Sequence, residues 1–283
     1  MSRRDDLTHH RIHHFGAGTS ALGGIITSPF HRNIPGQAAL NLPSVGGYAS
    51  VRVEKLAVDD QLGFAAAHAA VSGDLDRHLP AWNTMSTISV EGLNVFGVIT
   101  ADRVVARIIT EHPTDPDAAG EGKRAWQKVS FLGTQFTNLR ISGVAVMVEL
   151  DYDLFGRFGD GAFPSEPANL RPSFLKHANA HREQMTQKGC PRWMTDRYAS
   201  KHPEGQSMSM VSTLVNQIEV KGSLPGTQCG NVFDLPGFGR VILGELAVDS
   251  NSFHVTMMRL ELGCPTGANL ALSEAYVHGS THP

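Results

Sequence analysis

One short phrase occurs twice in this sequence, and both copies fit paired β-strands. Residues 93–98 read LNVFGV and residues 139–144 read LRISGV. Each copy runs directly into a stretch of β-branched residues, which favour strands. Each also carries a glycine, Gly97 or Gly143, at a point where the chain can bend sharply. The repeat therefore predicts two strand-bend-strand units, which is a prediction of architecture and not of chemistry.

Further strands are predicted by the alternation of apolar and polar residues. The clearest period of two covers 144–150, where the valines and Leu150 share one face. The chain has 29 Gly and 15 Pro but only 18% charged residues, which suits strands joined by tight turns. We predict a mainly β fold, an antiparallel sandwich or closed barrel of about eleven strands with one α-helical insertion. The periodicity does not decide between sandwich and barrel.

The chain divides by composition into three parts. Residues 174–188 lack Pro and Gly, follow Pro172 and precede Gly189, which predicts a helix inside an otherwise strand-rich sequence. The first forty residues are rich in His, Gly, Ser and Pro and show no sustained period. The predicted parts are an extended arm at 1–40, a helical insertion or lid at 152–206, and one β domain formed by 41–151 and 207–283.

The overall charge argues against a nucleic-acid partner, and the lengths of the apolar runs argue against a membrane span. The 24 Lys+Arg and 27 Asp+Glu give a net charge of -3, whereas nucleic-acid binding depends on clustered cations. No run approaches the roughly 18 apolar residues of a membrane span. We therefore expect no nucleic-acid partner and no membrane span.

Three cysteines without C-x-x-C spacing predict reduced, structural thiols. Ser2, Arg3 and Arg4 weakly resemble the start of a twin-arginine export signal. The segment that follows is poorly hydrophobic and has no clear cleavage site. A cytoplasmic location is the better prediction.

Four histidines near the start, His9, His10, His13 and His14, form the pattern HH-x-x-HH. On a helix these imidazoles would share a face and could hold zinc, nickel or copper. A polar tail without a metal function is the simpler interpretation.

Four other histidines are candidate ligand-binding residues: His112, His177, His181 and His254. His177 and His181 lie four residues apart in the predicted helix, as in helical zinc pairs, but Ala178 stands where a metalloprotease has its general base. His112 follows a strand rich in charged residues, and His254 lies alone on an apolar strand face. A solvated helix face, ordinary cross-strand ion pairs and a core histidine are the simpler interpretations of these positions.

Signatures of nucleophilic catalysis and of cofactor binding are missing from the sequence. There is no G-x-S-x-G motif, no phosphate-binding loop and no dinucleotide glycine pattern. We therefore predict no cofactor, and the sequence assigns no catalytic residue.

The order of the motifs at 92–107, 136–143 and 235–241 resembles a set of uncharacterised bacterial proteins. More distantly, it resembles the β-rich module of the choice-of-anchor surface proteins of Gram-positive bacteria. The likeness covers roughly 40–150 and 208–279, and it implies a β fold without catalytic residues. Export and anchoring do not carry over, since the chain lacks a convincing export signal and carries the helical insertion.

Three hypotheses for the function remain at this stage. The first is a non-enzymatic β module that assembles with itself or with a protein partner through its sheets and its arm. The second is a small-ligand binder or enzyme whose pocket is covered by the insertion. The third is a metal-dependent role of the histidine-rich arm.

Overall fold

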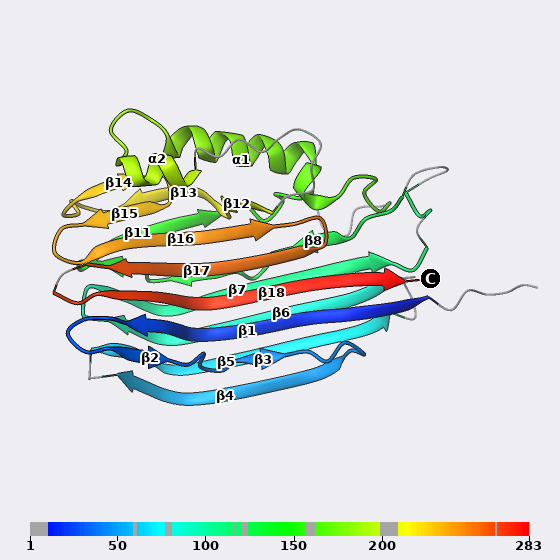
Figure 1. Cartoon of the computed structure of the whole chain (residues 1–283), viewed down its shortest axis with the longest axis horizontal. Coiled ribbons are helices and arrows are strands. Elements are labelled where there is room, and N and C mark those ends of the chain that lie inside the picture. Colours follow the sequence, from blue (N-terminus) through cyan, green and yellow to red (C-terminus); the bar gives the residue numbers. More distant parts are fainter. Residues whose placement is uncertain are drawn as a thin grey trace, which may run out of the picture.

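The structure is a computed structural model that describes residues 11–58, 61–76, 81–115, 117–119, 124–156, 162–198, 209–263 and 265–282. Two antiparallel nine-stranded sheets pack face to face (Figure 1). The prediction of a mainly β, antiparallel fold is confirmed. Of the two predicted architectures, the described residues form the sandwich and no closed barrel.

The first sheet has the order β14-β15-β16-β17-β18-β1-β2, with β12 paired to β16 and β3 paired to β1. Its strands are β1 (Ile12–Ile26), β2 (Arg32–Ile34), β3 (Leu40–Asn41), β12 (Met210–Thr213), β14 (Thr227–Cys229), β15 (Val232–Leu235), β16 (Gly239–Val248), β17 (Ser252–Leu262) and β18 (Ala268–His282).

The second sheet has the order β13-β11-β10-β7-β6-β5-β4, with β8 and β9 paired to β7. Its strands are β4 (Gly47–Val58), β5 (Leu62–Asp76), β6 (Ala81–Val95), β7 (Ile99–Pro113), β8 (Lys128–Ser130), β9 (Gln135–Thr137), β10 (Arg140–Ile141), β11 (Val144–Leu150) and β13 (Val215–Val220). Several strands are only two to four residues long, so the described chain has more strands than the periodicity predicts.

The predicted extended arm at 1–40 is wrong for β1, which lies inside the first sheet between β18 and the short strands β2 and β3. The reason lies in its glycines. Gly16 and Gly18 leave room for the rings of His278 and Tyr276 on the neighbouring strand, at positions where a Cβ atom would lie within 2.6 Å of those rings. A strand built of small residues shows little apolar alternation, so its sequence is not typical of a strand.

Both copies of the repeated phrase form the turn of a hairpin. Between β6 and β7, Phe96 and Gly97 have φ of 53° and 68°, and the N–H of Val98 donates to the carbonyl of Val95 at 3.0 Å, within a three-residue loop. Between β10 and β11, Ser142 and Gly143 have φ of 50° and 78° and form a two-residue loop. Two successive positive φ angles define the type I′ turn, whose twist matches that of the flanking strands. The predicted bend within a sheet is therefore a complete reversal of the chain.

In each long strand, the residues that point to the core change once along its length between odd-numbered and even-numbered positions. In β7, Ile99 and Ala101 are buried, but the alternation then continues from Val104 through even-numbered residues. The pairing skips a position at the switch and resumes in the same register on both sides, as in Glu91↔Arg103 and Leu93↔Ala101. A comparable break crosses the first sheet at Gly244 and Ser273, which both have positive φ. The period-two pattern therefore holds on either side of the break in each long strand, but it does not continue through the break.

One long side of the sandwich is closed by the chain between β11 and β12. This segment forms the 3-10 helix η1 (Ala168–Leu170) and the helices α1 (Pro172–Met185) and α2 (Arg192–Tyr198), which lie along the top of Figure 1. Phe174 of α1 stacks on Phe155, which contacts Phe253 edge-to-face in the main core. Leu214 joins the two sheets here, because its N–H donates to Gly244 and its carbonyl accepts from Asp151, both at 2.8 Å.

Candidate functional site

The opposite long side of the sandwich ends in β4, which pairs only with β5 among the described residues. Along β4, the outward Tyr48, Ser50, Arg52 and Glu54 alternate with partly buried residues. Arg52 and Glu54 form an ion pair at 2.5 Å on the exposed face. Charged side chains on the exposed face of a strand are typical of sheet edges.

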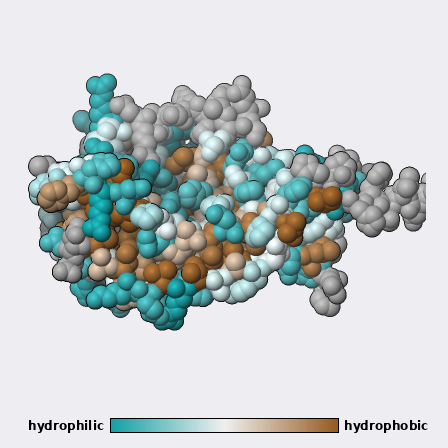
Figure 2. Space-filling view, turned by 60° about the horizontal axis from the view of Figure 1, so that its bottom comes forward, coloured by the Kyte–Doolittle hydropathy of each residue, from teal (hydrophilic) through white to brown (hydrophobic). Residues whose placement is uncertain are grey.

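An apolar seam runs along the inner face of β4. It consists of Ala49, Val51, Val53 and Leu56, which pack against the core but remain partly exposed. Val45, two residues before β4 begins, is a further exposed apolar side chain, with 87% of its surface exposed. Figure 2, turned to bring the β4 side forward, shows apolar side chains in a band bordered by polar ones. The β4 side is therefore both unpaired and apolar within the described chain.

Only part of β4 offers a regular edge. Lys55 has a φ of 39°, and the pairing with β5 skips this residue between Glu54↔Ala66 and Leu56↔Phe64. A positive φ in a residue other than glycine breaks the extended backbone. The regular stretch of the edge therefore ends at Glu54.

His112 lies in a buried aromatic cluster at the end of β7. Its ring centroid is 4.7 Å from that of His13, which stacks on Trp82 at 5.0 Å. Burial, strengthened by His13 and His278, lowers the pKa of His112 to about 3, and burial lowers the pKa of His13 to about 4. Both imidazoles are therefore neutral at physiological pH.

His177 and His181 lie on α1 and point to the sheets. His177 Nε2 is 2.8 Å from the carbonyl of Thr213, and its Nδ1 is 3.8 Å from Asp151. His181 is buried with its Nε2 2.9 Å from Asn231 Oδ1, and burial lowers its pKa to about 4. Each ring has its own protein partner, so the pair holds the helix to the β scaffold. The predicted solvated helix face is wrong for His181.

His254 lies on the outer face of the first sheet, not in the core. Its Nε2 is 3.3 Å from Glu274 Oε1, and 47% of its side chain is exposed. The four candidate histidines thus lie in three separate parts of the fold, with only His177 and His181 together on α1. The groove beside α1 is lined by Gln184, Thr213 and Asn216 among others, and by none of the four.

The histidine-rich pattern does not form one face in the described residues. His9 and His10 lie outside them. His13 and His14 are consecutive in β1, where side chains project to opposite faces, so His13 is buried and His14 is exposed. Within the described ranges there is no group of three or more histidine, cysteine or acidic side chains that could hold a metal ion.

Within the part of the chain that the structure describes, no helix is long and apolar enough to span a membrane.

These features define a class: an antiparallel β-sandwich with one side closed by helices and the other ending in an unpaired apolar edge within the described residues. The chain belongs to the family described as Domain of unknown function (DUF8256), whose model matches residues 13–249. This match begins within β1, so the first strand is part of the family domain. No curated protein and no solved structure matches the chain. The resemblance to the choice-of-anchor module stays a prediction.

Proposed function

We propose that the chain is a non-enzymatic structural module that assembles with a second copy of itself, through antiparallel pairing of β4 with β4 of that copy. The observation that carries this proposal is the long β4 edge with its apolar seam. An unpaired strand edge presents backbone donors and acceptors that another strand can satisfy. Identical edges favour a two-fold dimer, because the same surface serves both copies.

The regular stretch of β4 indicates one register. Its midpoint between Tyr48 and Glu54 is Val51, so a two-fold axis there brings Val51 opposite its own copy. On the inner face, Ala49 then meets Val53 of the second copy and extends the apolar seam. On the outer face, Ser50 meets Arg52 and Tyr48 meets Glu54 of the second copy. No two like charges lie opposite one another, and like charges would oppose the pairing.

The shape of the sandwich supports this side as the interface. The other long side is covered by α1 and α2 and joined across the sheets by Leu214. The first sheet ends beside β4 in the short strands β2 and β3, which leave the seam accessible. The alternative of a ligand pocket beneath the insertion has less support, because Phe155 and Phe174 fill that space.

A pair of substitutions at Tyr48 tests both the assembly and its register. The side chain is 69% exposed, so its replacement leaves the fold intact. In this register, position 48 faces Glu54 of the second copy on both sides of the two-fold axis. Tyr48→Glu therefore creates two pairs of like charges in the dimer, and Tyr48→Lys creates two pairs of opposite charges. At roughly 0.2–1 kcal/mol for each cross-strand pair, the two variants should differ several-fold in dimer Kd.

Sedimentation velocity over a range of concentrations measures that Kd. The proposal requires a concentration-dependent dimer that Tyr48→Glu weakens and Tyr48→Lys strengthens. A monomer at every concentration would contradict the assembly, and equal Kd values for the two variants would contradict the register.

A cytoplasmic location stays a prediction.

A further inference from the structure

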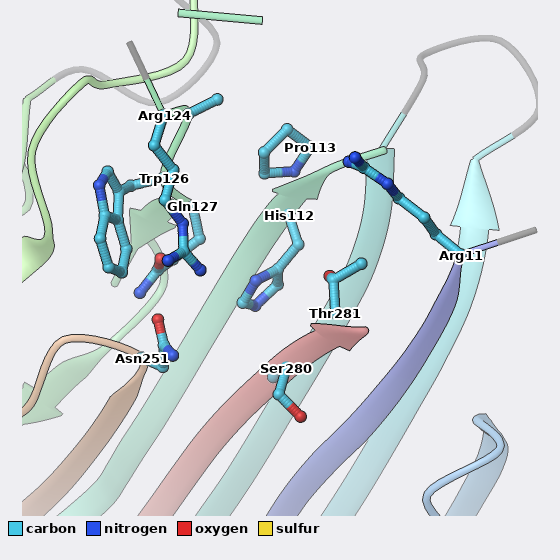
Figure 3. Close-up of a pocket in the computed structure, with 11 residues that line it drawn as sticks. Arg11, His112, Pro113, Arg124, Trp126, Gln127, Asn251, Ser280 and Thr281 are labelled. Atoms are coloured by element: carbon cyan, nitrogen blue, oxygen red, sulfur yellow. The ribbon is translucent and has the colours of Figure 1, made fainter. Parts of the chain in front are cut away.

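A polar cavity of about 360 Å³ opens at the end of the sandwich, away from the β4 edge. It lies where β7 and β18 end and β1 begins, next to the segment before β8 (Figure 3). The side chains that shape it include Arg11, His112, Arg124, Trp126, Asn251 and Thr281. This volume is within the range of small-molecule pockets and exceeds the space that a single ion needs.

The charged side chains that line the cavity are positive. Arg11 and Arg124 both line the cavity, and none of the described lining residues is acidic. The Arg124 guanidinium lies 4.5 Å from the Trp126 ring centroid, which orients its flat group. One Arg11 nitrogen donates to the carbonyl of Thr114 at 3.4 Å. Because a guanidinium carries five N–H donors, both arginines retain donors for a ligand.

The floor of the cavity contains a buried imidazole without a partner at one nitrogen. His112 Nε2 has no hydrogen-bond partner among the described residues, although the ring is only 6% exposed. Gly279 makes room for it, since a Cβ there would lie 2.6 Å from that nitrogen. Figure 3 shows the His112 ring between Gln127 and Thr281. A buried polar atom left unpaired costs free energy, and a ligand that bonds to it recovers that cost.

We propose that this cavity binds a small organic oxyanion, a compound that carries a phosphate or carboxylate group. Arg11 and Arg124 would hold the anionic group by charge-assisted hydrogen bonds, which guanidinium groups form with both anions. His112 would complete the site from the floor through its unpaired nitrogen. Asn251, Ser280 and Thr281 offer hydrogen bonds to the rest of the ligand at the rim. The site is independent of the proposed assembly, because none of its residues lies on β4.

Isothermal titration calorimetry at constant ionic strength tests the proposal with four probes: inorganic phosphate, glucose 6-phosphate, glucuronate and uncharged glucose. We expect saturable binding of glucose 6-phosphate or glucuronate, and none of glucose. The two organic anions distinguish phosphate from carboxylate as the recognised group. Binding of inorganic phosphate alone would overturn the proposal in favour of a simple ion site.

The double variant Arg11→Gln and Arg124→Gln should weaken binding at least tenfold. Both side chains are exposed, so the variant is expected to fold, and its thermal midpoint checks this. The matched control is Arg140→Gln, which removes an exposed arginine of β10 that bonds to Gly143. The result that would overturn the proposal is an absence of binding by the natural chain, or unchanged binding by the double variant.

Discussion

The backbone N–H of Ser142 donates to the carbonyl of Val98 at 2.7 Å, so the two copies of the repeated phrase lie side by side. β10 pairs with β7 through Ile141↔Ile99, which sets the second hairpin next to the first. The repeat in the sequence therefore corresponds to two neighbouring type I′ turns at one end of the second sheet. Both turns need residues that accept positive φ, which is a structural reason for the glycines.

Substitutions in the second hairpin should change stability in opposite directions. A Cβ at Gly143 meets nothing within 4 Å, but the φ of 78° disfavours any other residue, so Gly143→Ala should cost about 1 kcal/mol. Ser142 is exposed and also has a positive φ, so Ser142→Asn should stabilise the protein by about 0.5 kcal/mol. Urea denaturation measures both, and a stabilising Gly143→Ala would contradict the turn assignment.

Arg171 should be the main polar anchor of the helical insertion. It is 5% exposed, and its guanidinium donates to the carbonyls of Glu166 and Phe155, both at 3.3 Å, and of Gln127. Burial lowers its pKa to about 10, so it remains charged. Arg171→Met leaves these carbonyls without their donor and should lower the free energy of unfolding by about 3 kcal/mol.

The control for this prediction is Lys176→Met, on the exposed face of α1. Surface substitutions of this kind usually change stability by about 0.5 kcal/mol or less. Equal unfolding midpoints for the two variants would show that Arg171 does not hold the insertion in place.

Acid should destabilise the protein through three buried histidines. Burial lowers the pKa of His13 and His181 to about 4 and that of His112 to about 3, from an ordinary value of 6.5. Between pH 6.5 and 4 the unfolded chain binds protons that the folded chain does not. The stabilisation is therefore complete above pH 6.5 and is lost as the pH falls, by up to about 1.4 kcal/mol per pH unit for each histidine.

Urea midpoints from pH 8 to pH 5 measure this loss. His181→Gln removes one of the three titrating groups and should reduce the dependence on pH in that window. Tyr198→Phe keeps the ring whose centroid lies 5.1 Å from that of His181, and it should leave the dependence unchanged. A pH dependence that is the same in His181→Gln would contradict the role of this histidine.

The sequence predicts the strands well wherever an uninterrupted alternation marks them, as in β11. It does not predict β1, because a strand of glycine and alanine that receives rings from its neighbour has no apolar period of its own. Nor does it predict the cavity, whose two arginines lie more than a hundred residues apart in the sequence and line the same space only because β7 and β18 end where β1 begins. The sequence indicates His112 as a candidate ligand-binding residue and His13 as part of a candidate metal-binding pattern. It does not indicate that their rings lie in contact.

The position of β4 at an edge depends on which strands pair, and no local pattern determines that. The alternation of Arg52 and Glu54 with valines is equally compatible with a half-buried strand inside a sheet. Only the complete order of strands shows that the seam lies at the boundary of the sandwich.

Disulfide cross-linking tests the proposed two-fold pairing of β4 most directly. With Val51 on the axis, the Cα atoms of the two copies would lie roughly 4.5–5.5 Å apart, within the range that a disulfide spans. Val51→Cys should therefore give a covalent dimer under mild oxidation, beyond the level of the natural chain with its own cysteines. Tyr48→Cys, on the same strand but about 20 Å from its copy in this register, should not. Cross-linking of Val51→Cys alone supports the assembly, whereas a Val51→Cys variant that stays monomeric would contradict it.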